Sequence, residues 1–223
     1  MGLTREARVS PGGVLDVGQQ ALASKAAADP RREAARREEQ ALLVRLRRGD
    51  PEAFESLVRE HQDRLYDFCF RMVGDREEAH DLVQEIFVSV HQNVRRFRED
   101  ARLSTWLFRI SKNHCLNRLK YLQRRGRGRS EVYDEVSAAA IAEGGGAPPQ
   151  PDAALDVARE RARVQRAISQ LDPDARMLVA LRDIEGLSYD EIVDITELPE
   201  GTVKSRLHRA REKLADLLGR FEP

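Results

Sequence analysis

Apolar residues recur every three or four positions along most of this chain, which is the spacing of one face of an α-helix. The clearest stripe begins after Asp50 and Pro51, an N-cap followed by a proline at the first helical position, and ends near Gly74. Ser188 and Glu191 have the spacing of a capping box at the start of a short helix. The same criteria predict further helices over residues 31–49, 75–94, 104–124, 154–171, 173–186 and 202–218. No segment requires a strand, so the pattern predicts an all-α fold.

Residues 125–152, which form most of a linker that we place at 125–157, break this helical pattern. The segment contains GRGRS, three consecutive glycines and three prolines in four residues. Such a composition is typical of a flexible linker. We therefore predict two small helical domains, 41–124 and 158–220, which are joined by this acidic linker and preceded by a largely disordered extension, 1–40.

The 38 basic and 38 acidic residues cancel, but they are unevenly distributed. Residues 50–94 carry eleven acidic residues against four arginines, whereas residues 95–129 carry twelve basic residues against two acidic ones. Residues 130–158 have six acidic residues and no basic one, and residues 204–213 have five basic residues against one acidic. Two basic segments, each at the end of a helical unit, indicate two contacts with nucleic acid.

Several classes of site are disfavoured by the sequence. Cys69 and Cys115 are far apart in the chain and belong to no CxxC or Cys/His cluster, so we expect two buried, reduced thiols and no metal or cofactor. No apolar run approaches the roughly 20 residues of a membrane span, and the N-terminus lacks the apolar region of a secretory signal. We therefore expect a cytoplasmic protein with no membrane insertion. The His80-Asp81 dipeptide, with His61 upstream, resembles part of a helical metal-dependent phosphohydrolase, but no further ligands follow at suitable spacing, so we expect no enzyme activity.

The last predicted helix has the make-up of a DNA-reading helix. Its apolar stripe, which must pack on the preceding helices, consists of Val203, Leu207, Ala210, Leu214 and Leu217. The opposite side presents Lys204, Ser205, His208 and Arg209. A helix-turn-helix places such side chains in the major groove, where Arg and Lys donate to guanine. We take the segment from Thr202 to Lys213 as the reading helix.

The run GTVKSRLHRAREKL, with the residues before it from Ile168 onward, resembles region 4 of the extracytoplasmic-function (ECF) sigma factors of bacterial RNA polymerase. The resemblance implies that this helix reads the −35 promoter element and that the domain contacts the flap of the second-largest polymerase subunit. It also implies an anti-sigma factor as a partner. By position, the DNA-binding residues would be Thr202, Lys204, Ser205, Arg206, His208, Arg209 and Arg211.

The first predicted domain, including FREDARLSTWLFRISKNHCLNRLKYLQRR, resembles region 2 of the same family. Its basic, amide-bearing helix face suits a separated DNA strand, because amides bond exposed base edges and arginines follow phosphates. The resemblance implies that loop 98–104 forms a pocket for an extruded base of the −10 element. Trp106 either stacks on a base or, as we favour for a lone tryptophan on a helix, supports this loop from the core. The expected −10 residues are Arg98, Asp100, Ser104, Trp106, Arg109, Lys112, Asn113, Asn117 and Lys120.

The acidic helix 75–94 would, by the same resemblance, dock on the clamp coiled coil of the largest polymerase subunit through Asp81, Gln84 and Glu85. An acidic surface there suits a basic partner helix. The chain departs from the family at His80, where an acidic residue is usual, which leaves Asp81 and Glu85 to carry the charge. The negative charge of the linker suggests the hypothesis that it occupies a polymerase channel that normally holds nucleic acid.

The function implied by the resemblance is that of a sigma factor, which binds core RNA polymerase and directs promoter recognition, promoter opening and initiation at a specific regulon. The alternative is a helix-turn-helix repressor or activator that binds duplex DNA without polymerase. That alternative explains the C-terminal helix but leaves the acidic helix and the second basic face without a task.

Overall fold

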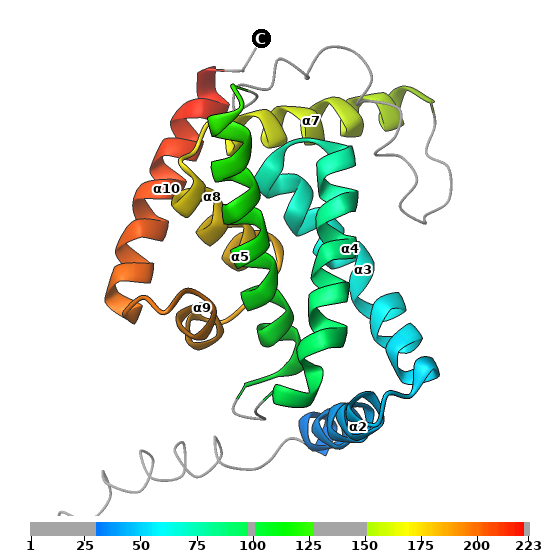
Figure 1. The fold of residues 1–223 in the computed structure, drawn as a ribbon. Helices are drawn as coiled ribbons and strands as arrows, with labels where there is room; N and C mark the ends of the chain where they lie inside the picture. Colours follow the sequence, from blue (N-terminus) through cyan, green and yellow to red (C-terminus); the bar gives the residue numbers. More distant parts are fainter. Residues whose placement is uncertain (1–29, 98–100, 127–150, 221–223) are drawn as a thin grey trace, which may run out of the picture. The chain divides into compact units, whose positions relative to one another are not determined.

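The computed structural model describes residues 30–97, 101–126 and 151–220. Every regular element within these ranges is helical, which confirms the predicted all-α fold (Figure 1). The chain divides into two compact units, 1–45 and 46–223, and α2 (Pro30–Arg47) spans the boundary between them. The predictions for residues 1–29, for most of the linker, and for Arg98 and Asp100 concern positions outside the described residues. None of the described helices is long and apolar enough to cross a membrane.

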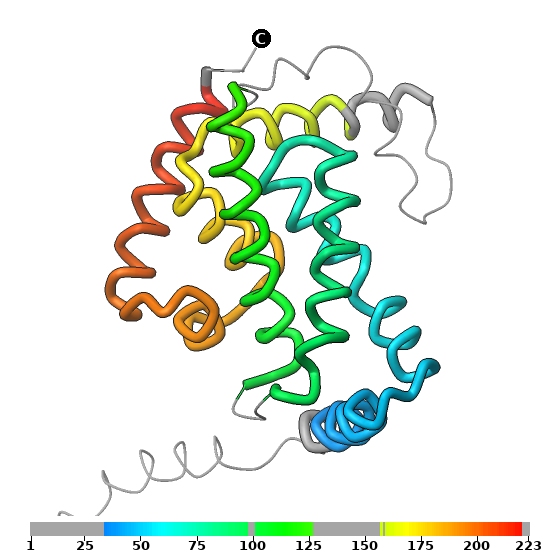
Figure 2. The backbone as a smooth tube through the Cα atoms, viewed as in Figure 1, coloured from blue at the N-terminus to red at the C-terminus, as the bar shows by residue number. Residues whose placement is uncertain are grey.

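Three long helices form the first group. They are α3 (Pro51–Val73), α4 (Arg76–Asn93) and α5 (Leu103–Arg124), with the 3-10 turn η1 (Val94–Arg96) after α4 (Figure 2). Asp50 caps α3 as predicted, because its carboxylate accepts from the amide of Glu52 at 3.0 Å. Gly74 ends the helix with a φ of 77°, a left-handed conformation that glycine adopts without strain.

The core between α3 and α5 contains both cysteines. The Sγ atoms of Cys69 and Cys115 lie 3.7 Å apart, and both side chains are fully buried. The hydrogen bond with Cys69, together with burial, raises the pKa of Cys115 well above its usual range. The Cys115 thiol is therefore buried and protonated, which makes it a poor nucleophile. The sequence analysis treated them as separate, and the contact between them was not predicted.

The second group is built from shorter elements. They are α7 (Pro151–Ser169), α8 (Pro173–Val179), the π-helical turn η2 (Ala180–Ile184), α9 (Tyr189–Thr196) and α10 (Glu200–Arg220). The helix predicted over 173–186 is thus two elements, because the amide of Glu185 donates to the carbonyl of Ala180, five residues back, at 3.0 Å. Helix α7 begins at Pro151 instead of residue 154, so the end of the predicted linker is helical.

Helices α9 and α10 form the predicted helix-turn-helix. The capping box is present, with the amide of Glu191 donating to Ser188 Oγ at 3.2 Å and the amide of Ser188 donating to Glu191 Oε2 at 2.8 Å. Glu197 ends α9 with a φ of 61°, which turns the chain within three residues toward α10. Along α10, the predicted stripe is buried at Val203, Leu207, Ala210 and Leu217.

The two groups pack on each other within the unit 46–223. Arg176 of α8 is 9% exposed and donates to three backbone carbonyls, those of Met72 in α3, Ser169 at the end of α7, and Leu171 at 3.1 Å. A guanidinium has the several donors that such an arrangement needs. Arg176 therefore ties the end of α3 to the end of α7.

We expect Arg176→Met, which keeps most of the side-chain volume, to lower the free energy of unfolding by roughly 2 to 3 kcal/mol, because buried carbonyls lose a charged donor. Urea denaturation followed by circular dichroism measures the change. Lys213→Met is the matched control, since Lys213 is exposed on α10. Equal stability of the two variants would contradict the assigned role of Arg176.

Candidate nucleic-acid interface

The outward side of α10 carries the four predicted base-facing residues. Lys204, Ser205, His208 and Arg209 are all exposed, on the side of the helix opposite its buried stripe. Their partners are local: Lys204 Nζ lies 2.6 Å from Glu200 Oε1, and Arg209 Nε donates to the carbonyl of Ser205 at 3.3 Å. The hydrogen bond with Glu200 raises the pKa of Lys204. Exposed contacts of this kind contribute little to stability, so these side chains can exchange them for DNA.

The other three predicted DNA-binding residues of α10, Thr202, Arg206 and Arg211, differ in their surroundings. The amide of Thr202 donates to the carbonyl of Pro199 at 2.8 Å. Arg206 Nη1 lies 3.6 Å from Asp174 Oδ2 of α8. Arg211 forms a two-point ion pair with Asp183 of η2, and this hydrogen bonding raises the pKa of Arg211. Arg211 is thus the residue of this set that also anchors α10 to the turn before α9.

The basic side of α5 faces the end of α9. Arg109 Nε donates to the carbonyl of Asp194 at 3.0 Å, and Lys112 Nζ donates to the carbonyl of Ile195 at 2.9 Å. Both carbonyls belong to the last turn of α9, where a helix carries a partial negative charge. Two of the predicted strand-binding cations are therefore already bonded to backbone oxygens, a contact that the sequence did not indicate.

Farther along α5, Asn113, Asn117 and Lys120 are exposed. Asn117 borders a hollow of about 610 Å³ that is also lined by Glu78, Glu85, His114, Arg118, Tyr121 and Arg125. Tyr121 is 44% exposed, and the Arg125 guanidinium lies 4.6 Å from the centre of its ring. An aromatic ring beside an amide and an arginine suits an unstacked base. Tyr121 was missed by the sequence analysis, although its position one turn after Asn117 was readable.

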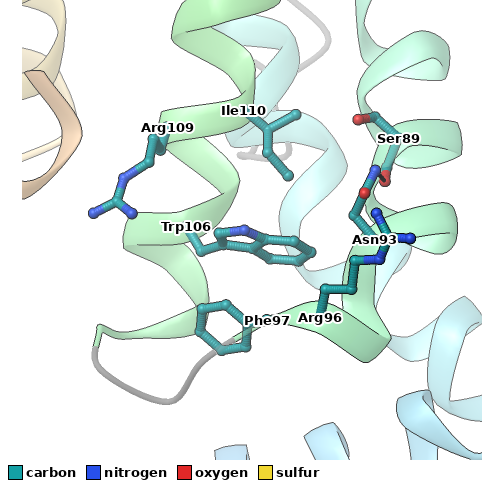
Figure 3. Close-up of a pocket in the computed structure, with 7 residues that line it drawn as sticks. All are labelled: Ser89, Asn93, Arg96, Phe97, Trp106, Arg109 and Ile110. Atoms are coloured by element: carbon teal, nitrogen blue, oxygen red, sulfur yellow. Dashed lines mark hydrogen bonds between the residues drawn. The ribbon is translucent and has the colours of Figure 1, made fainter.

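A second cavity of about 430 Å³ lies between the end of α4 and the start of α5 (Figure 3). Its lining consists of Ser89, Asn93, Arg96, Phe97, Trp106, Arg109 and Ile110. Trp106 is half-buried and not fully in the core: its ring lies 4.8 Å from that of Phe97 and borders the cavity. Ser104, near the start of the helix, is also half-buried. The cavity combines aromatic and cationic side chains in the way that a base and its phosphate require.

Asn93 and Arg96 were not among the predicted strand-binding residues, but both line this cavity. Asn93 Nδ2 donates to the carbonyl of Ser89 at 2.8 Å, so one hydrogen bond fixes its amide group. Figure 3 shows both side chains on the α4 side of the cavity, opposite Arg109 on α5. The basic run at 95–96 was visible in the sequence, whereas its position across from Trp106 depends on how α4 packs on α5.

The acidic face of α4 is connected to α5 by an ion-pair network. Arg118 bonds Glu78 and lies 2.7 Å from Glu85 Oε1, while His114 Nδ1 lies 3.6 Å from Glu85 Oε2. Burial by itself would lower the pKa of Arg118, but the hydrogen bond with Glu78 and the charges of both carboxylates outweigh it and raise that pKa. Of the three predicted docking residues, Asp81 and Gln84 are exposed, and Glu85 is exposed but paired.

An apolar residue stands in the middle of this face. Val88 is 56% exposed and lines a hollow of about 510 Å³ together with Asp81, Gln84, Glu85, Ser89, Gln92 and His114. Docking surfaces commonly surround an apolar contact with polar residues. Val88 was missed by the sequence analysis, which considered only charge. His80, where the chain departs from the family, packs on Tyr66 with ring centroids 4.5 Å apart.

Within the part of the chain that the structure describes, no group of three or more His, Cys, Asp or Glu side chains is arranged to hold a metal ion. The HD dipeptide therefore has no companion ligands among the described residues.

Two family models match the chain: sigma-70 region 2 matches residues 57–125, and sigma-70 region 4 matches residues 161–214. The first match contains α5 and its basic side, and the second contains the helix-turn-helix.

Relatives match over most of their length. The RNA polymerase sigma-H factor of Pseudomonas aeruginosa is 37% identical over 79% of this chain and 92% of its own. The ECF sigma-E factor of Escherichia coli is 36% identical with the same coverage, and the ECF factor SigW of Bacillus subtilis is 32% identical over 77% and 92%.

Two solved structures are similar in fold. CnrH, solved in complex with the cytosolic domain of CnrY, matches 82% of this chain and 99% of its own with a TM-score of 0.60 at 25% identity. The sigma factor RpoE of Bartonella quintana, solved with the anti-sigma factor NepR, matches 76% and 98% with a TM-score of 0.57 at 25% identity.

Proposed function

This chain belongs to the extracytoplasmic-function sigma factors of bacterial RNA polymerase, and we propose that it divides promoter recognition between α10 and α5. As a sigma factor it binds core RNA polymerase and directs it to promoters, where transcription starts. The observation that carries the proposed division is the presence of two separate basic surfaces, one on each group of helices. We infer that the chain acts by binding in the cytoplasm and carries out no catalysis of its own.

Helix α10 reads the −35 element as duplex DNA. Most of the apolar stripe of α10 is buried, so the helix-turn-helix holds α10 in place. Its outward side presents Lys204, Ser205, His208 and Arg209. Arginine and lysine there can donate to guanine O6 and N7, and serine or histidine can bond other base edges. Thr202 and Arg206, at the sides of the helix, suit phosphates.

Helix α5 holds the separated strand of the −10 element. Asn113 and Asn117 offer exposed amides for base edges, and Lys120 offers an exposed charge for the backbone. The cavity beside Trp106 suits one extruded base, because Phe97 and Trp106 supply an aromatic wall and Arg96 supplies a cation. Arg98 and Asp100 belong to the same expected set.

For α5 to bind the −10 strand, α9 must move away from α5. The end of α9 lies on the side of α5 that carries Arg109 and Lys112, which donate to the carbonyls of Asp194 and Ile195, so α9 occupies the side on which the strand would lie. The −35 and −10 elements lie about 25 base pairs apart, roughly 85 Å of duplex at 3.4 Å per pair. A single compact unit cannot reach both elements, so we infer that the two groups of helices separate when the promoter is bound.

The exposed face of α4 binds the clamp coiled coil of the largest polymerase subunit. Asp81 and Gln84 are exposed and can bond a basic helix, and Val88, one turn after Gln84 in the same hollow, offers apolar contact. Region 4 would contact the flap of the second-largest subunit. Because two structurally similar proteins were solved with the partners CnrY and NepR, we also infer an anti-sigma factor as a partner.

We expect Arg209→Ala to weaken holoenzyme binding to promoter DNA by roughly 1 to 3 kcal/mol, the scale of one good base contact. The measurement is a gel-shift titration on a promoter whose start site has been mapped by in vitro transcription. Lys213→Ala removes the same charge from the same helix outside the reading face, and should cost much less. Similar losses for both variants would mean that α10 contributes charge and no base reading.

We expect Asp81→Asn to weaken core polymerase binding by about 1 kcal/mol, because a charge pair with a basic partner is lost. Val88→Ser should weaken binding by about 1 to 2 kcal/mol through lost apolar burial. Titration of labelled protein with core enzyme measures both, and Glu77→Gln, exposed on the same helix, is the control. An unmodified chain that fails to bind core polymerase would instead favour a repressor or activator.

A further inference from the structure

We propose that Arg47, the last residue of α2, is a positioning residue for the cavity beside Trp106. This inference rests on the proposed function, in which that cavity takes a base of the −10 strand. Arg47 precedes the region 2 match and lies 50 positions before its hydrogen-bond partner Phe97, so no sequence pattern pointed to it. The proposal extends the strand-opening machinery to the N-terminal side of region 2.

The contact itself is a charge-assisted hydrogen bond. Arg47 Nη2 donates to the carbonyl of Phe97 at 2.7 Å. The amide of Phe97 donates to the carbonyl of Val94 at 3.2 Å, so both backbone polar groups of Phe97 are held. At Phe97 the backbone leaves the helical conformation of η1, with φ and ψ of −61° and 124°. Arg47 thus fixes the point at which the chain leaves η1 toward the predicted −10 loop.

Phe97 connects the hydrogen bond from Arg47 to the wall of the cavity. Its side chain is buried, and its ring lies 4.8 Å from that of Trp106 at an angle of 35°. Both rings line the cavity, and Figure 3 shows them one above the other at its lower end. A displaced Phe97 backbone would therefore move or tilt the aromatic wall, and a base needs that wall at stacking distance.

Arg47 is itself held on a well-defined turn. The preceding residue, Leu46, is buried, and the amide of Gly49 donates to the carbonyl of Leu46 at 3.0 Å. Gly49 has a φ of 78°, which closes the end of α2 directly before the N-cap Asp50 of α3. Because this turn leads directly into a capped helix, the backbone of Arg47 is held in place while its guanidinium bonds Phe97.

Arg47 also adds positive charge next to Phe97, in a cavity lining that already contains Arg96 and Arg109, and charge alone would attract DNA without positioning anything. The neighbouring residue separates the two roles. Arg48 carries the same charge one position later and is exposed, whereas the hydrogen bond to the carbonyl of Phe97 comes from Arg47. Arg48→Ala is therefore the matched control for Arg47→Ala, and Arg47→Lys keeps both the charge and a donor.

Trp106 is the only tryptophan of the chain, so it reports on the wall directly. In the full chain, Arg47→Ala should shift the Trp106 emission maximum to longer wavelength and raise its acrylamide quenching constant, whereas Arg48→Ala should change neither. In holoenzyme, permanganate reactivity of −10 thymines should show promoter opening reduced about threefold to tenfold for Arg47→Ala, with most of it recovered by Arg47→Lys. Core binding and −35 duplex binding should stay as in the unmodified protein.

Equal emission and equal opening for Arg47→Ala and Arg48→Ala would overturn the proposal, and so would reduced opening with unchanged Trp106 emission. If Arg47→Ala lowers the melting temperature strongly, Arg47→Gln, which keeps a shorter donor, is measured in its place against the same criteria. A separate variant, Asn93→Ala, tests the proposed function. If holoenzyme with this variant opens the promoter normally, the cavity does not take part in strand binding. The emission shift would then still decide whether Arg47 positions the wall.

Discussion

The arrangement of this structure depends on helix α5, which has an apolar side that must be buried and a cationic side that needs oxygen partners. Helix α5 buries Leu107, Phe108 and Cys115 against its neighbours, while its other side carries cations that need oxygen partners. In the compact unit, the last carbonyls of α9 provide those oxygens for Arg109 and Lys112. A helix C-terminus and a DNA phosphate offer the same chemistry, partial or full negative charge on exposed oxygen. In the compact unit, two cations of the surface proposed for the −10 strand are therefore hydrogen-bonded to the chain's own carbonyls.

The two partners differ in strength. A hydrogen bond from a charged donor to a neutral carbonyl contributes about 1.5 to 3 kcal/mol at most, because each group gives up water to form it. Phosphates add full charge and the release of counterions, so several such contacts compete with the two bonds to α9 and with the other contacts between the groups, such as that of Arg176 with Met72. In the proposed mechanism, polymerase presents the strand and binding favours a form in which the two groups of helices are separated.

Local chemistry made much of the fold predictable from the sequence. Asp50, Gly74 and the Ser188–Glu191 capping box act within one turn of the chain, and the structure has each of them where the pattern placed it. The apolar stripe of α10 was equally readable, because burial follows helical periodicity.

The contacts that were not predictable join distant positions. Cys69 meets Cys115 across 46 residues, Arg47 meets Phe97 across 50, and Arg109 meets Asp194 across 85. No spacing rule connects such pairs, since they depend on how whole helices pack. The π turn at η2 was missed for a related reason: one extra residue in a helical turn leaves the local pattern almost unchanged.

The most direct test of this account is energy transfer between dyes on α5 and α10. Gln123→Cys and Asp216→Cys provide exposed attachment sites outside the proposed contacts, and the native thiols are buried. The account predicts high transfer in the free protein and a large loss in the open promoter complex, where the two helices occupy elements about 25 base pairs apart, roughly 85 Å. Transfer that stays equally high in the open complex would contradict the claim that α5 exchanges α9 for DNA.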